Sequence, residues 1–137
     1  MKKLNILPKK DSPEVLFDPQ SGDFSIVGIS HPENISSFFD PVMNWLEEYL
    51  NEIRKTGKTN AKPIKLKLFF KYINSASYKY LITFLQKMNE FVELRVLVNL
   101  EWLYEPEDED MRDAGYELME YANIKIPFTC NVCSDSL

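Results

Sequence analysis

The sequence has few of the residues from which enzyme active sites and metal centres are most often built. Its 137 residues include one histidine, His31, two cysteines and four glycines. It contains no glycine-rich phosphate loop, no G-x-S-x-G elbow and no histidine–glutamate helix motif for a metal. A Ser-His-Asp site would have to use His31, whose string HPEN is typical of a helix start, with Asn34 or Glu33 bonded to free backbone N–H groups. These absences predict a protein that is not an enzyme and binds no metal or cofactor.

The two cysteines, Cys130 and Cys133, stand in TCNVC near the end of the chain. Such a pair can be redox-active or can supply half of a zinc site. Thioredoxin-type pairs open a helix, however, whereas these follow the last predicted strand, and a tetrahedral zinc site would need two more ligands. A small cytosolic thiol or metal protein, or an enzyme using Cys130, Cys133 or His31, is therefore the alternative hypothesis.

Long hydrophobic runs are also absent. No apolar stretch is long enough to cross a bilayer, and the start, MKKLNILPKK, lacks the apolar segment of a secretory signal peptide. We therefore expect a cytoplasmic protein without membrane insertion. A hydrophobic content of 45% with 13% aromatic residues is typical of a folded protein, and the length suits a single domain over residues 1–137.

The negative charge is concentrated at one end of the chain. Residues 1–100 contain 14 Lys and Arg against 11 Asp and Glu, whereas residues 101–137 contain 2 against 10. This excludes nucleic acid as a partner of the acidic segment, because phosphates need cations opposite them. The carboxylates are typical of a solvated helix start, and a partner-docking surface is the other interpretation.

The first half of the chain predicts a hairpin and a helix. Two short apolar runs, Val15–Phe17 and Phe24–Ile29, flank the turn DPQSGD. Apolar residues then recur every three or four positions from Ile35 to Ile53, a stretch that includes NWLEEYL and is interrupted by Pro41. Because Asp40 can cap and Pro41 suits a first helical position, we expect a short turn and then the main helix from about residue 41.

The second half predicts alternating strands and helices. KPIKLKLFFKYIN alternates, with Lys65, Lys67 and Lys71 on the less apolar side, and a helical stripe begins at Tyr78. A strand in ELRVLVNLEWLYE precedes a helix whose expected inward residues are Met111, Ala114, Leu118 and Tyr121. A last strand is expected within residues 124–132. The order, an N-terminal hairpin and then αβαβαβ, predicts an α/β sandwich of about five strands with helices mainly on one face and an incompletely covered second face.

The joint YINSASYK between the central strand and its helix is rich in polar side chains, with Asn74, Ser75 and Ser77 within four positions. The first N–H groups of a helix have no intrahelical acceptor, and the helix dipole leaves partial positive charge there. Asn74 or Ser75 could simply cap the helix. Alternatively, one hydroxyl could be a phosphorylation switch, since the same position can hold a dianion.

Several separated motifs make the chain similar to one known family. They are the joint YINSASYK, HPEN (31–34), NWLEEYL (44–50) and EDEDMRDAGYELME (107–120). With these, the chain resembles the SiaC family of bacterial regulatory phosphoproteins over nearly its whole length. The resemblance implies a fold similar to anti-sigma-factor antagonists (STAS-like).

The resemblance also implies a partner-switching role in cyclic di-GMP and biofilm signalling. A kinase and a PP2C-type phosphatase would act on Ser75, and the unphosphorylated protein would bind and activate a diguanylate cyclase or similar effector. Serine stands where the family's best known acceptor is threonine, and Ala76 stands where a further serine is common. The partner-binding residues implied are Tyr72, Asn74, Ser75, Ser77, Tyr78 and Lys79.

Overall fold

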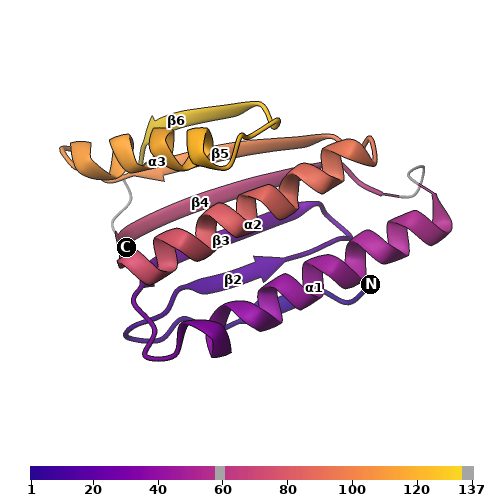
Figure 1. The fold of residues 1–137 in the computed structure, drawn as a ribbon, viewed down its shortest axis with the longest axis horizontal. Coiled ribbons are helices and arrows are strands. Elements are labelled where there is room, and N and C mark those ends of the chain that lie inside the picture. The colour runs from indigo at the N-terminus through magenta and orange to yellow at the C-terminus, as the bar shows by residue number, and fades with distance from the viewer. Residues whose placement is uncertain (58–60, 134–137) are drawn as a thin grey trace.

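Strands and helices follow one another nearly in the predicted order (Figure 1). The computed structural model describes residues 1–57 and 61–133. Its strands are β1 (Leu4–Ile6), β2 (Glu14–Phe17), β3 (Asp23–Ser30), β4 (Ile64–Ile73), β5 (Val98–Tyr104) and β6 (Phe128–Val132). Its helices are α1 (Ile35–Thr56), α2 (Ser75–Glu93) and α3 (Glu109–Tyr121). Within the described ranges, no helix combines the length and the apolar character needed to span a bilayer.

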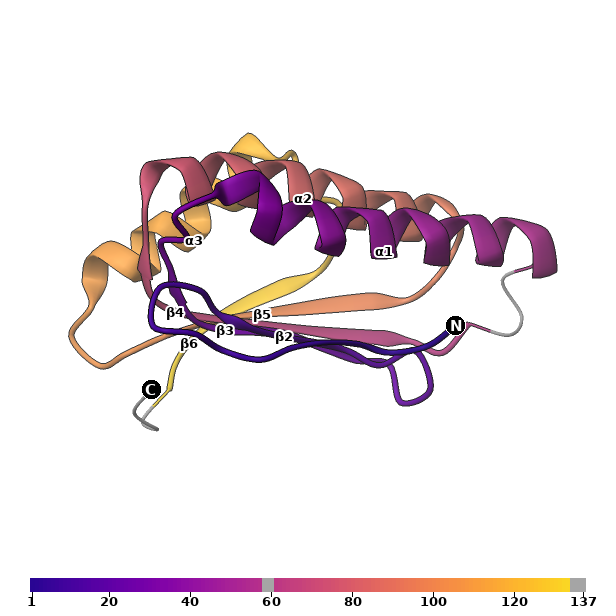
Figure 2. The ribbon, with the colours of Figure 1, turned by 90° about the horizontal axis from the view of Figure 1, so that it is seen from below.

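The six strands form one sheet in the order β1-β2-β3-β4-β5-β6. β1, β2 and β3 pair antiparallel, whereas β3 to β6 run parallel. Each helix therefore carries the chain one step across the sheet in the same direction. Because such crossovers have one favoured hand, α1, α2 and α3 all pack on the same face, as Figure 2 shows.

The prediction of about five strands is wrong by one, because the residues of β1 show no strand pattern in the sequence. This strand has only three residues, too few for an alternating pattern to emerge, and Pro8 soon follows it. β1 is recognised as a strand only from its antiparallel pairing with β2, in which Leu4 lies opposite Phe17. The hairpin of β2 and β3 is confirmed.

The expected helix start near residue 41 is also wrong. α1 begins at Ile35, and its N-cap Asn34 accepts a hydrogen bond from the Ser37 N–H through Oδ1 at 3.1 Å, so the reading of HPEN as a helix start is confirmed. Pro41 lies inside α1, where it lacks the N–H that would bond the carbonyl of Ser37. The apolar spacing before Pro41 thus outweighs the proline's usual preference for a helix start.

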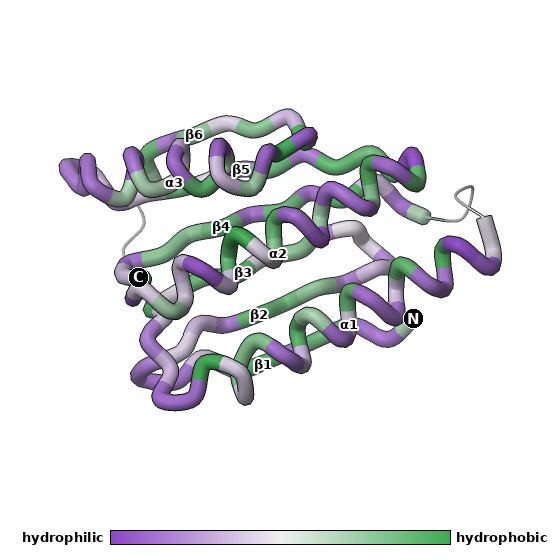
Figure 3. The backbone as a smooth tube through the Cα atoms, in the orientation of Figure 1, coloured by the Kyte–Doolittle hydropathy of each residue, from purple (hydrophilic) through white to green (hydrophobic). Residues whose placement is uncertain are grey.

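The hydrophobic core lies between the sheet and the helices, and α3 packs on it through contacts with Trp102. Figure 3 shows hydrophobic residues along the central strands and many hydrophilic residues along the helices. The fully buried Trp102 of β5 donates a hydrogen bond from Nε1 to the Met111 carbonyl oxygen at 3.0 Å, and a Cβ built on Gly115 would lie 2.5 Å from its ring. α3 thus turns Gly115 inward, and Tyr121, predicted to face inward, is 66% exposed.

The second face of the sheet carries no helix in the part of the chain that the structure describes (Figure 2). Lys65, Lys67 and Lys71 of β4 are exposed, while Leu66 and Leu68 between them are buried under the helices. The predicted placement of helices mainly on one face is therefore confirmed.

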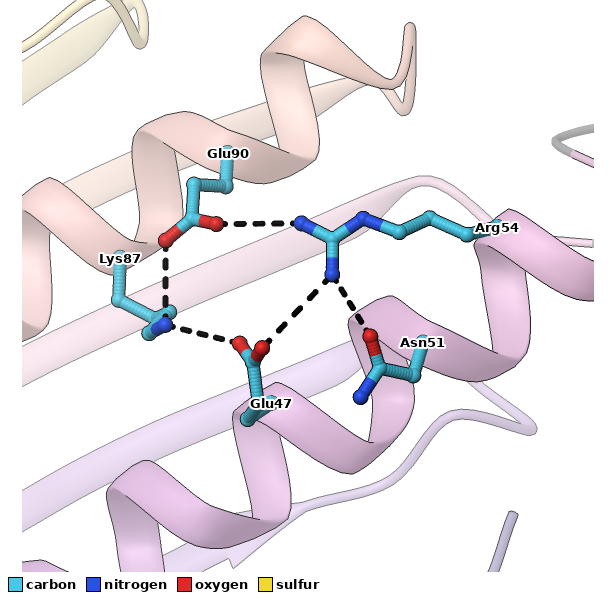
Figure 4. Close-up of polar contacts among 5 residues, drawn as sticks. All are labelled: Glu47, Asn51, Arg54, Lys87 and Glu90. Atoms are coloured by element: carbon cyan, nitrogen blue, oxygen red, sulfur yellow. Dashed lines mark hydrogen bonds and ion pairs between the residues drawn. The ribbon is translucent and has the colours of Figure 1, made fainter.

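A network of ion pairs joins the outer surfaces of α1 and α2 (Figure 4). Lys87 Nζ lies 2.8 Å from Glu47 Oε2 and 3.2 Å from Glu90 Oε2. Arg54 lies 3.1 Å from Glu90 Oε1, 3.8 Å from Glu47 Oε1 and donates to Asn51 at 2.8 Å. A hydrogen bond from Lys87 is the main cause that lowers the pKa of Glu47. Because all these groups are partly exposed, each pair contributes at most about 1 kcal/mol.

Candidate functional site

The joint between β4 and α2 places the predicted site at the carboxyl end of a central parallel strand, at the left of Figure 2. β4 ends at Ile73 and α2 begins at Ser75. Asn74 between them is the N-cap: its backbone is extended, and its Oδ1 accepts a hydrogen bond from the Ser77 N–H at 2.8 Å. Capping, which the sequence left open between Asn74 and Ser75, is thus done by Asn74.

Ser75 is exposed at the first position of α2. Since Asn74 performs the capping, the Ser75 hydroxyl is not needed for it. The position combines access from solvent with the partial positive charge of a helix amino terminus. Solvent access leaves the hydroxyl open to a modifying enzyme, and the helix amino terminus favours added negative charge.

Ser77 is fully buried, with an exposed fraction of 0%. Its Oγ donates to the carbonyl oxygen of Ser30 at 3.1 Å and accepts from the Ser30 hydroxyl at 2.8 Å. This pair joins α2 to the end of β3. The resemblance placed Ser77 among the partner-binding residues. In this fold Ser77 does not reach the surface, because the third residue of α2 faces the core.

His31 and Tyr72 lie beside the cap. The Asn74 Nδ2 donates to His31 Nδ1 at 2.8 Å, and the ring centroids of His31 and Tyr72 are 5.9 Å apart with the planes at 87°. Tyr72 is 51% exposed and His31 is exposed. His31 was not among the residues predicted for this site. The only signal that could have found it is strand pairing, because Ser30 lies opposite Ile73 and the residues after them are therefore neighbours.

Tyr78 and Lys79 extend the site along α2. The half-buried Tyr78 donates from its hydroxyl to Glu117 Oε2 of α3 at 3.2 Å, and Lys79 is exposed. Burial, together with Glu117, raises the pKa of Tyr78 to about 12, so the phenol is neutral at physiological pH. Tyr72, Asn74, Ser75, Tyr78 and Lys79 are thus brought together on the surface at one end of the molecule, while Ser77 lies beneath them.

The described residues around Cys130 do not have the geometry of a redox-active thiol or a metal site. Cys130 lies in β6, and burial is the main cause that raises the pKa of its thiol, whereas a reactive thiol needs a lowered pKa. Its Sγ is 3.9 Å from the Arg112 carbonyl oxygen. Over residues 1–57 and 61–133, no group of three or more His, Cys, Asp or Glu side chains is arranged to hold a metal ion. His31 is bonded to Asn74, far along the chain from either cysteine.

Comparison with known proteins identifies a family that covers most of the chain. The model of the SiaC family of regulatory phosphoproteins matches residues 6–131. An uncharacterized protein of Pseudomonas aeruginosa (strain UCBPP-PA14) is 28% identical over 120 residues, which cover 88% of this chain and 90% of the relative.

Solved structures are similar over almost the whole fold. Apo-SiaC of Pseudomonas aeruginosa is 27% identical with a TM-score of 0.79, covering 96% of this chain and 99% of that one. A chain in the crystal structure of the diguanylate cyclase SiaD in complex with its activator SiaC, also from Pseudomonas aeruginosa, is 28% identical with a TM-score of 0.81, covering 95% and 99%.

Proposed function

The chain belongs to the SiaC family of regulatory phosphoproteins, and on that premise we propose that it is a non-catalytic partner-switching regulator controlled by phosphorylation of Ser75. The unphosphorylated form binds and activates a diguanylate cyclase or similar effector, and so raises cyclic di-GMP and favours biofilm. A protein kinase adds the phosphate and a PP2C-type phosphatase removes it. The chain acts in the cytoplasm as one STAS-like regulatory domain over residues 1–137.

The main support for Ser75 as the phosphorylation site is its exposure and its freedom from the contacts that hold the joint together. Of the polar residues at the joint, Asn74 is occupied in capping and Ser77 is buried against Ser30, whereas Ser75 is exposed and takes no part in either contact. The hydroxyl that is free for modification is thus also the one at the first position of α2.

The physical basis of the switch is a change of surface charge without a change of fold. A phosphate adds about −1.5 to −2 charges and three acceptor oxygens. At the amino terminus of α2 the helix dipole stabilises these charges, and the exposed Lys79 lies one turn further on. A partner that docks on Tyr72, Tyr78 and their neighbours would then meet a dianion, and desolvating it would cost more than the contacts return.

The effector class is supported by similarity to a proven complex. SiaC of Pseudomonas aeruginosa activates the diguanylate cyclase SiaD, and the chain matches a chain of that complex over 95% of its length. The raised pKa of the Cys130 thiol gives no comparable support to a thiol function. A diguanylate cyclase of the SiaD type is therefore the first effector to test.

The proposal is tested by intact-mass measurement after co-expression with the cognate kinase. We expect one added phosphate on the wild type and none on Ser75→Ala. Ser37→Ala is the matched control, because Ser37 is an exposed serine in the first turn of α1; it should be labelled like the wild type. Equal labelling of Ser75→Ala and the wild type would refute the assignment.

A further inference from the structure

The side-chain amide of Asn74 makes two hydrogen bonds in opposite roles. Its Oδ1 accepts from the Ser77 N–H, and its Nδ2 donates to His31 Nδ1, each at 2.8 Å. The two bonds join the first turn of α2 to the residue that follows β3. Asn74 is also the residue immediately before Ser75, so its conformation bears directly on the acceptor serine.

The two bonds depend on each other because an amide has only one acceptor end. If Asn74 turned over, Nδ2 would face the Ser77 N–H, two donors would oppose each other, and the cap would be lost. An acceptor opposite Nδ2 adds to this preference, because a turned-over amide would also set Oδ1 against that acceptor. His31 Nδ1 is that group, which requires the ring to be neutral with its hydrogen on Nε2.

We propose that His31 is a positioning residue for Ser75: by accepting from Asn74 through Nδ1, it holds Asn74 Oδ1 on the Ser77 N–H and keeps the first turn of α2 in one conformation. This deepens the proposed function and rests on it where phosphorylation is concerned. The kinase and the phosphatase then meet Ser75 in a fixed geometry, and His31 acts on the reaction only through Asn74.

The backbone contacts separate this role of the ring from a general structural one. The His31 N–H donates to the Asp11 carbonyl oxygen at 2.8 Å, and the Asn74 N–H donates to the Ser30 carbonyl oxygen at 3.0 Å. Both backbone segments are therefore held without the imidazole. His31 is exposed, and its ring contacts the Asn74 amide and makes a T-shaped contact with the Tyr72 ring.

Two substitutions of His31 separate the acceptor from the ring. His31→Asn keeps an acceptor oxygen at the position of Nδ1 but removes the ring. His31→Phe keeps a ring that can still contact Tyr72 but presents carbon to Asn74. Asn74→Ala removes the cap itself and sets the size of the largest effect expected, and the double variant His31→Phe/Asn74→Ala tests whether His31 acts through Asn74.

The first measurement is amide hydrogen exchange at Ser77 by NMR, at neutral pH and with the purified full chain. We expect exchange roughly fivefold faster in His31→Phe, as for loss of a cap, and unchanged within about twofold in His31→Asn. Nitrogen NMR of the wild-type imidazole should show Nδ1 without a proton. Unchanged exchange in His31→Phe, equal effects of the two variants, or a protonated Nδ1 would overturn the proposal.

The second measurement is the rate of Ser75 phosphorylation by the cognate kinase. His31→Phe and Asn74→Ala should each slow labelling about fivefold, the double variant should be no slower than Asn74→Ala, and His31→Asn should match the wild type. Additive losses would overturn the positioning role. If the wild type itself is not labelled, the proposed function fails, while the exchange at Ser77 still tests the contact of His31 with Asn74.

Discussion

Ser30 and Ser77 form a buried pair of hydroxyls in which each oxygen is bonded. The Ser30 Oγ donates to Ser77 Oγ at 2.8 Å, and Ser77 Oγ donates onward to the Ser30 carbonyl oxygen at 3.1 Å. β3 and α2 are thereby joined directly beneath the exposed Ser75. The two serines of the joint thus differ in their contacts: Ser77 bonds α2 to β3, and Ser75 faces solvent.

Ser77→Ala should destabilise the fold, because it leaves the buried Ser30 hydroxyl without its acceptor. We expect the free energy of unfolding to fall by about 1–3 kcal/mol. Ser75→Ala makes the same chemical change at an exposed position and should stay within about 0.5 kcal/mol of the wild type. Urea denaturation of both variants measures the difference; equal losses would mean that the buried pair does not stabilise the joint.

Gly115→Ala should destabilise the packing of α3 on the sheet. A Cβ at this position would lie 2.5 Å from the Trp102 ring, so the helix or the ring must move, at a cost of about 1–3 kcal/mol. Glu120→Ala, an exposed change on the same helix, is the control and should have little effect. Thermal unfolding followed by tryptophan fluorescence checks the prediction, and a Gly115→Ala protein as stable as the wild type would contradict it.

The free energy of unfolding should fall in strong alkali because the Tyr78 phenol is held neutral in the folded protein. Burial raises the pKa of its phenol from 10.0 to about 12, so the unfolded chain releases this proton at lower pH than the folded chain does. The stabilisation is complete below pH 10.0 and is lost as the pH rises toward about 12. Unfolding free energies measured over this range should fall more steeply for the wild type than for Tyr78→Phe. Parallel curves would show that Tyr78 titrates normally.

Cys130 should react slowly with thiol reagents in the folded protein. Its pKa is raised mainly by burial, and the thiolate is the reactive form. In a Cys133→Ser variant, which leaves Cys130 as the only thiol, reaction with Ellman's reagent should be slower than that of a free cysteine and should accelerate in urea. Reaction faster than that of free cysteine would instead support the alternative thiol function.

Much of the fold could be predicted because its signals are local. The alternating residues of β4, the helical spacing in α1 and the turn between β2 and β3 each follow from neighbouring residues. β1 could not, since a three-residue strand depends on its partner, Phe17 opposite Leu4. The inward face of α3 was predicted in part: Met111 and Leu118 are buried, but the place beside Trp102 is taken by Gly115, whose small size hydrophobicity does not indicate.

The site could be predicted only in part for the same reason. That a polar residue of the joint caps α2 follows from the unsatisfied N–H groups of a helix start, whereas the choice of Asn74 over Ser75 comes from the structure. The burial of Ser77 and the contact between His31 and Asn74 depend on the pairing of β3 with β4, residues 43 positions apart in the latter case. No local pattern contains that pairing.

On the proposed function, a phosphate on Ser75 ejects the effector while the fold remains. This claim is tested most directly by calorimetric titration of a SiaD-type diguanylate cyclase with the unmodified chain and with a sample whose full phosphorylation at Ser75 is verified by mass. We expect saturable binding of the unmodified chain, binding weaker by about tenfold or more after phosphorylation, and similar unfolding temperatures. Equal affinity of the two forms would contradict it.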